Sequence, residues 1–139
     1  SLFASASYVL LEIKKNYPEC PLKIVPGVTS ISAAAAAGSW PLSLQRSQIR
    51  ILPTPNDPED LESLLNEVKG TNQVLILLKL GSRWEWVRKL LEKQELLSNT
   101  LFAQRVGFQD ERIMNANQVD SISDNSYFSL LIIGSVSLP

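Results

Sequence analysis

The chain has 139 residues, 45% of them hydrophobic and 19% charged, which is the size and composition of a single folded globular domain. Its 13 basic and 14 acidic residues are scattered and give a net charge of −1, which argues against nucleic acid or an anionic membrane as a partner. Histidine is absent and Cys20 is the only cysteine, which excludes Ser-His-Asp and Cys-His nucleophilic sites, zinc sites of His and Cys ligands, and internal disulfides.

The first part of the chain alternates predicted helices and strands. Residues 2–17 carry apolar residues at helical spacing and end in a pair of lysines, the pattern of an amphipathic helix. Residues 21–26, PLKIVP, are predicted to form a short buried strand. An alanine-rich helix follows, capped by Thr29 or Ser30 and closed by Gly38.

The remaining elements complete an α/β order. Asn56 or Asp57 is expected to cap one helix and Ser82 the next, and the apolar run NQVLILLKLG between them indicates a strand buried on both faces. The predicted elements are a strand at 47–54, a helix at 56–70, a strand at 72–81, a helix at 82–97, and strands at 99–106, 111–117 and 126–136. This order predicts one α/β domain whose mixed, partly antiparallel sheet is flanked by helices. No apolar run has the length of a bilayer-spanning helix and no signal peptide is visible, so we expect a cytoplasmic location.

The stretch VPGVTSISAAAAAGSWPL, residues 25–42, is the strongest candidate for a binding site. Gly27 frees the backbone to turn sharply, and Thr29 and Ser30 place hydroxyl groups and backbone amides at a helix N-terminus, where anionic ligand groups are favoured. The alanines at 33–37 let a sheet or a ligand pack close to the helix. A capped helix packed on a sheet explains the same pattern without any ligand, and the residues alone leave both interpretations open.

Other residues are weaker candidates. Lys79 interrupts an apolar strand near its end and must emerge into solvent or into a crevice, where ligands of open α/β sheets bind. Trp84 and Trp86 either stack on a flat ligand or cover the sheet, which is the commoner role. Cys20 lies in a predicted surface turn and has a structural or neutral role. No carboxylate pair suggests acid/base chemistry, no residue is assigned as catalytic, and no metal site is expected.

The segment LKIVPGVTSISAAAAAGSWPL resembles the central part of the tetrapyrrole (corrin/porphyrin) methylases, and its PGVTS and PL elements resemble the precorrin-2 C(20)-methyltransferase branch. The segments NQVLILLKLGS, LFAQRVGFQDERI and SYFSLLIIGSV are similar to later parts of that family in the same order. The resemblance implies an S-adenosylmethionine-dependent methyltransferase of cobalamin biosynthesis. Because the family has a further Gly-rich domain ending in GDP, residues 1–139 are expected to be a single domain, the C-terminal portion, with the N-terminal cofactor-loop domain missing.

The resemblance also implies which residues contact the cofactor. These are Leu2, directly after the expected GDP, Thr29 and Ser30 after PGV, Leu80 at the end of the central strand, and Ala103 and Ser129 on later strands. A tetrapyrrole substrate would bind in a trough that this chain lines on one side, and S-adenosyl-L-homocysteine would be the product. The chain alone is expected to be inactive.

Alternatives remain within and outside this fold. Another branch would methylate a different precorrin carbon, act in siroheme synthesis, or act on RNA or diphthamide, although the near-neutral charge argues against RNA. A rival of another class is a non-catalytic ligand-binding or dimerisation domain. The apolar strands and the helix that carries Trp84 and Trp86 favour a homodimer as the assembly.

Overall fold

The computed structural model describes residues 5–120 and 126–134, and the chain divides into one unit of residues 1–30 and another of residues 31–139. The first unit contains α1 (Ser5–Asn16), the amphipathic helix expected from the sequence, with Lys14 and Lys15 in its last turn. None of the described residues of α1 is buried, and Tyr8 is 75% exposed. Among the described residues of its unit, none covers the apolar side chains of this helix completely.

The strand predicted at residues 21–26 is absent, and this prediction is wrong. Residues 21–29 have no regular secondary structure, and Ile24 and Val25 are 52% and 71% exposed rather than buried. A strand is stable only when a neighbouring strand takes up its backbone hydrogen bonds. Among the described residues no strand pairs with this segment, so its β-branched residues remain in an extended, solvent-exposed chain.

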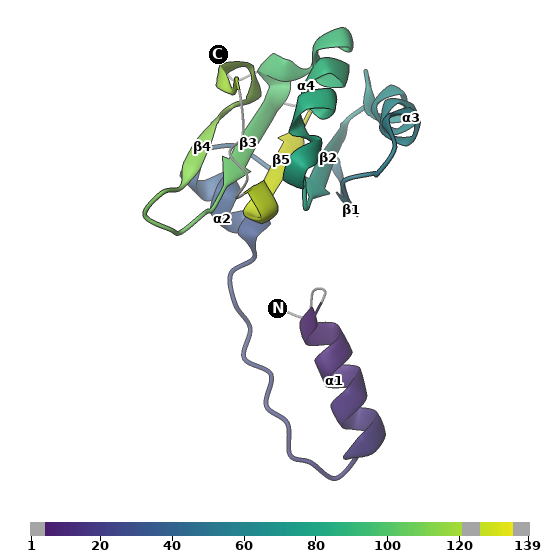
Figure 1. The fold of residues 1–139 in the computed structure, drawn as a ribbon, viewed down its shortest axis with the longest axis vertical. Coiled ribbons are helices and arrows are strands. Elements are labelled where there is room, and N and C mark those ends of the chain that lie inside the picture. Colours follow the sequence, from purple (N-terminus) through teal and green to yellow (C-terminus); the bar gives the residue numbers. More distant parts are fainter. Residues whose placement is uncertain (1–4, 121–125, 135–139) are drawn as a thin grey trace. The chain divides into compact units, whose positions relative to one another are not determined.

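The second unit is built on a five-stranded sheet of order β1-β2-β5-β3-β4 (Figure 1). Its strands are β1 (Gln48–Pro53), β2 (Gln73–Leu78), β3 (Thr100–Gln104), β4 (Arg112–Asn115) and β5 (Ser129–Ile133). Strands β1 and β2 run parallel, whereas β5 is antiparallel to both β2 and β3, and β4 is antiparallel to β3. The predicted mixed, partly antiparallel sheet flanked by helices is confirmed.

Helices cover both faces of this sheet (Figure 1). On one face, α3 (Pro58–Val68) and α4 (Trp84–Lys93) pack on a core that contains Leu75, Leu77 and Phe102. On the other face, α2 (Ser30–Ala37) packs on a core that contains Val74 and Ile76. The two cores take alternate residues of the same strands, which is why the β2 sequence is a continuous apolar run.

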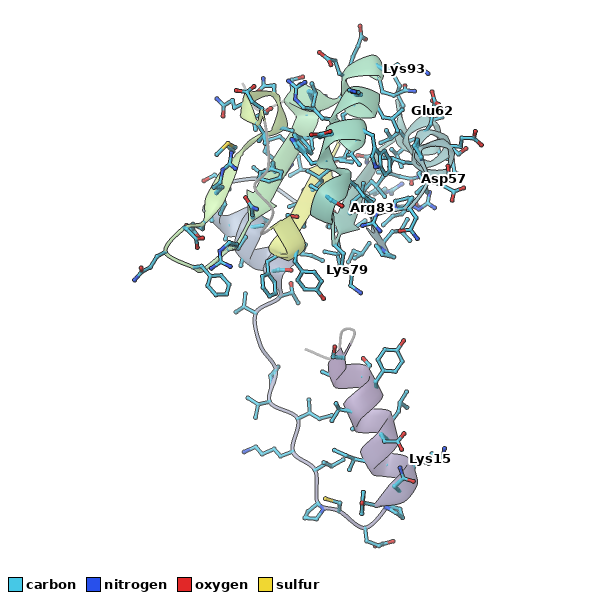
Figure 2. The ribbon with its side chains drawn as sticks, in the orientation of Figure 1. Lys15, Asp57, Glu62, Lys79, Arg83 and Lys93 are labelled. Carbon is cyan, nitrogen blue, oxygen red and sulfur yellow. The ribbon has the colours of Figure 1, made fainter. Side chains whose placement is uncertain are left out.

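The helix ends show which capping signals operate. Asp57, one of the two expected caps, accepts a hydrogen bond from the Glu59 amide at 3.0 Å and so caps α3. Ser82 does not cap α4, contrary to the prediction, because Gly81–Arg83 forms a 3-10 turn and α4 begins at Trp84. Lys93 of α4 and Glu62 of α3 form a salt bridge of 2.5 Å across the two helices (Figure 2).

Candidate functional site

The carboxyl end of β2 meets the start of β5 through a backbone hydrogen bond. The amide of Leu80 donates to the carbonyl of Ser129 over 3.2 Å, and the Leu80 carbonyl accepts from the Arg83 amide over 3.3 Å. The Leu80 side chain is completely buried. Both backbone polar groups of Leu80 are therefore already satisfied within the fold, and it presents no side-chain atom to a ligand.

Ala103 and Ser129 lie on neighbouring strands at the same end of the sheet. Ala103 is opposite Leu130 in the β3–β5 register, next to the pair formed by Gln104 and Ser129. Ala103 is fully buried in the core beneath α2, and Ser129 is 4% exposed. The fold thus brings Leu80, Ala103 and Ser129 to one edge of the sheet. All three are buried there and do not form part of the accessible surface.

Thr29 and Ser30 stand at the beginning of α2, whereas Leu2 lies outside the described residues. Ser30 is the first residue of the helix and is exposed, and Thr29 before it is half-buried. These are the two predicted contacts that remain accessible to a small molecule. An exposed helix start with hydroxyl groups suits a carboxylate or other acceptor-rich group.

The alanine run of α2 has a packing explanation. Ala34 and Ala35 are buried against the sheet, whereas Ala36 and Ala37 are exposed. At the end of the helix, a Cβ added to Gly38 would lie 2.8 Å from the side chain of Leu101. The small residues are therefore required by the close approach of the helix to the sheet. The sequence allowed either a sheet or a ligand to pack against these alanines, and in the structure it is the sheet that does so.

Sequence reasoning missed a groove at the carboxyl ends of β1 and β2. It encloses about 940 Å³, and its lining comes from the ends of β1 and β2, from α3 and from the turn before α4. The lining includes Pro53, Thr54, Asn56, Asp60, Lys79, Arg83 and Tyr127. Lys79 was expected to emerge into solvent or a crevice at this strand end, and it does (Figure 2). The rest of the groove joins residues distant in sequence, and no local motif marks it.

A buried amide at the same end of the sheet has no hydrogen-bond partner. Gln104, the last residue of β3, is 2% exposed, and its Nε2 is unpaired among the described residues. A buried donor without an acceptor costs free energy, and an acceptor from outside the chain would relieve that cost. The donor chemistry of this edge therefore fits a ligand that carries carboxylate or carbonyl oxygens.

The described residues show little sign of acid/base or metal chemistry. Within residues 5–120 and 126–134, no cluster of three or more Asp, Glu or Cys side chains is placed to hold a metal ion. The one described carboxyl group whose pKa clearly departs from its ordinary value is that of Asp110, which a hydrogen bond from Arg105 lowers. None of the helices in these ranges has the length and apolar character of a membrane span.

Comparisons with known proteins point in one direction. The family model of the tetrapyrrole (corrin/porphyrin) methylases matches residues 1–120. The chain is 33% identical over 110 residues to the cobalamin biosynthesis protein CobIJ of Mycobacterium tuberculosis (strain ATCC 25618 / H37Rv), covering 79% of this chain and 21% of the relative. It is 26% identical over 117 residues to the cobalt-precorrin-2 C(20)-methyltransferase of Salmonella typhimurium (strain LT2), covering 82% and 48% respectively.

Solved structures show the same fold. The methyltransferase CobJ matches with a TM-score of 0.62 and 21% identity, covering 99% of this chain and 61% of CobJ. The uroporphyrin-III C-methyltransferase of Thermus thermophilus in complex with S-adenosylhomocysteine matches with a TM-score of 0.56 and 20% identity, covering 96% and 60%. Of the curated relatives named above, the chain spans about a fifth of CobIJ and about half of the cobalt-precorrin-2 C(20)-methyltransferase.

Proposed function

The chain belongs to the tetrapyrrole (corrin/porphyrin) methylases, and on this premise we propose that it is the C-terminal portion of an S-adenosylmethionine-dependent methyltransferase. The proposed reaction is methylation of precorrin-2 at carbon 20 in cobalamin biosynthesis. The observation that carries the proposal is the family match over residues 1–120. The similarity to the cobalt-precorrin-2 C(20)-methyltransferase supports this substrate among the possible tetrapyrroles.

The proposed division between this chain and a further N-terminal domain is supported by exposed apolar surface in the first unit. Leu11 of α1 is 63% exposed, and Val25 and Val28 of the following extended segment are 71% and 83% exposed. Large apolar side chains exposed to this extent on one segment of chain are a sign of a surface that another part of the protein covers. A helix followed by a strand-like segment suits a second α/β sheet that the rest of the protein would supply. The chain alone would then lack part of the site and be inactive.

The residues of this chain suit a reaction that depends on positioning. When bound, S-adenosylmethionine would supply an activated methyl group on its sulfonium: the S–CH3 bond would break as the bond to the ring carbon forms, the proton of that carbon would pass to solvent, and S-adenosylhomocysteine would remain. Holding two reactants in attack geometry is worth roughly 7–11 kcal/mol of barrier. We assign the accessible Thr29 and Ser30 to hold the cofactor, as the family resemblance implies. The resemblance also assigns Leu80, Ala103 and Ser129 to the cofactor, and these buried residues would act by fixing their edge of the sheet.

A different ring carbon is the second candidate. The similarity to CobIJ at 33% identity favours cobalamin biosynthesis over siroheme, RNA or diphthamide methylation, but it does not select carbon 20. We also propose that the protein works as a homodimer in the cytoplasm. Light scattering of the purified protein tests the dimer.

Methyl transfer with an isotope-labelled methyl group tests the function. Protein extended at its N-terminus is incubated with labelled S-adenosylmethionine and precorrin-2, and the position of the label is read by NMR. We expect label at carbon 20 with the extended protein and no transfer with the 139-residue chain. Label at another carbon would replace the substrate assignment by the second candidate. No transfer to any tetrapyrrole by folded, extended protein would refute the proposed function.

A further inference from the structure

The groove at the carboxyl ends of β1 and β2 is lined by two cations, Lys79 and Arg83, that form no salt bridge among the described residues (Figure 2). Two carboxylates also line it, and one of them, Glu67, is already paired with Arg50 at 2.7 Å. The other, Asp60, lies in the first turn of α3, where the helix dipole stabilises its charge.

Arg83 is held in place from two sides. Its Nη1 donates to the carbonyl of Lys79 over 3.2 Å, and its Nη2 donates to Oδ1 of Asn56. Lys79 itself has a φ of 57°, a left-handed backbone conformation that is uncommon for a residue other than glycine. Strained backbone of this kind is concentrated at binding sites, because the surrounding structure must hold it. The guanidinium still has further N–H donors, and their planar arrangement matches a carboxylate.

A row of exposed aromatic rings continues from this groove. Tyr127, which lines the groove, meets Phe128 edge-on with ring centroids 5.1 Å apart, and Phe128 lies 6.1 Å from Phe108. The three residues are 68%, 57% and 50% exposed. At the end of the row, the Arg105 guanidinium stands over the Phe108 ring at 4.4 Å. Because the Tyr127 and Phe128 rings stand nearly perpendicular, a flat, conjugated partner can stack on one ring and receive an edge-on contact from the other.

Backbone hydrogen bonds fix the row and the groove relative to each other. The Arg105 amide donates to the Phe128 carbonyl over 2.8 Å, and the Leu80 amide donates to the neighbouring Ser129 carbonyl over 3.2 Å. The chain at 128–129 therefore ties the end of β3 to the end of β2. Cations and aromatic rings are thus presented together on one preorganised surface, rather than on independent loops.

We propose that this surface, made of Lys79, Arg83, Tyr127, Phe128 and Phe108, binds a flat conjugated ring that carries several peripheral carboxylates. The cations take the carboxylates, and the aromatic row contacts the ring. The inference rests on the proposed function, because the tetrapyrroles on the route to cobalamin belong to this chemical class, and it assigns their carboxylates to particular residues. It adds binding residues that neither the stretch at residues 25–42 nor the family resemblance identifies.

Porphyrin titrations of the 139-residue chain test the surface. The probe is an octacarboxylate porphyrin, followed by its visible absorbance and by quenching of tryptophan fluorescence, and a tetracationic porphyrin of the same ring size is the control ligand. Lys79→Asn removes one charge while asparagine tolerates the left-handed backbone. Arg83→Gln removes the second charge, and Tyr127→Ala removes a ring. Lys89→Gln, on an exposed position of α4 outside the groove, is the matched charge control.

We expect Lys79→Asn and Arg83→Gln each to weaken octacarboxylate binding about tenfold, since a hydrogen bond to a charged group is lost. Tyr127→Ala is expected to weaken it about fivefold, and Lys89→Gln to leave it unchanged. Circular dichroism of each variant verifies the fold. Equal affinity for all variants, absence of binding, or equal affinity for the tetracationic porphyrin would overturn the assignment.

The same variants in the extended protein separate this inference from the proposed function. If the extended wild type transfers methyl groups and Lys79→Asn and Tyr127→Ala leave the KM for precorrin-2 unchanged, the surface assignment is wrong and the proposed function stands. If the extended wild type transfers none, the proposed function itself fails. A monomer–dimer equilibrium that Tyr127→Ala abolishes would show that a second copy of the chain occupies the aromatic row instead, which also overturns the assignment.

Discussion

Replacing Ala34 by leucine tests why the helix after the Pro-Gly turn carries a run of alanines. Ala34 is completely buried between α2 and the sheet, in a core that includes Val74 and Ile76. Adding methylenes to a packed core costs about 1–3 kcal/mol. No spare space separates the helix from the sheet, because one Cβ at Gly38 would already lie 2.8 Å from Leu101. We therefore expect Ala34→Leu to cost about 3 kcal/mol, near the top of that range.

Urea unfolding followed by tryptophan fluorescence measures this loss, since Trp40 and Trp84 are buried in the two cores. A loss of about 3 kcal/mol corresponds to a fall in Tm of roughly 10 °C for a domain of this size. Ala36→Leu is the matched control, because Ala36 is an exposed position of the same helix and should change the free energy of unfolding by less than about 0.5 kcal/mol. Equal losses for the two variants would refute the packing explanation.

Three further predictions concern backbone conformation and charge. Gly134→Ala should cost more than about 2 kcal/mol, because φ is 107° and the new Cβ would lie 2.8 Å from the Gln73 carbonyl oxygen; a loss below about 1 kcal/mol in urea unfolding would contradict this. Lys79→Asn should leave the free energy of unfolding unchanged or raise it by up to about 1 kcal/mol, because asparagine tolerates the left-handed backbone conformation better than lysine. A clear decrease in the free energy of unfolding in the same assay would show that the backbone of Lys79 is not strained. The Arg105 hydrogen bond lowers the pKa of Asp110, so its stabilising contribution is present above the carboxyl's unfolded pKa and is lost as pH falls through the lower folded pKa. An NMR titration of Asp110 should show Arg105→Gln raising that pKa toward its ordinary value, and an unchanged pKa would exclude the pairing.

In the second unit, the sequence correctly predicted those features that depend on neighbouring residues in the chain, such as the start of a helix and the burial of a strand. Asp57 and Pro58 fix the start of α3 through a cap and a preset backbone angle, and neither depends on distant residues. The continuous apolar run of β2 predicted burial on both faces, and Val74 and Leu75 indeed enter opposite cores. Trp84 covers the sheet beside Phe102, at 5.3 Å between ring centroids, as the commoner role for such a residue predicted.

The failures arise where structure depends on a partner or on distant contacts. The apolar pattern at 21–26 is typical of a strand, but a strand needs a neighbour, and the described residues supply none. The position of the Arg83 guanidinium in the groove depends on its hydrogen bond to Asn56, which lies 27 residues earlier in the chain. Leu80 and Ser129 were proposed as contacts only through resemblance, and their hydrogen bond to each other follows from strand order, which residue patterns do not encode.

Calorimetric titration of S-adenosylhomocysteine into the N-terminally extended protein tests the central claim most directly. Thr29→Trp serves as the blocked variant, because Thr29 is half-buried directly before α2 and a bulky ring there would fill the space assigned to the cofactor. We expect binding by the wild type and its loss in the folded variant. No binding by the folded, extended wild type, or undiminished binding by Thr29→Trp, would contradict the assignment of this turn to the cofactor.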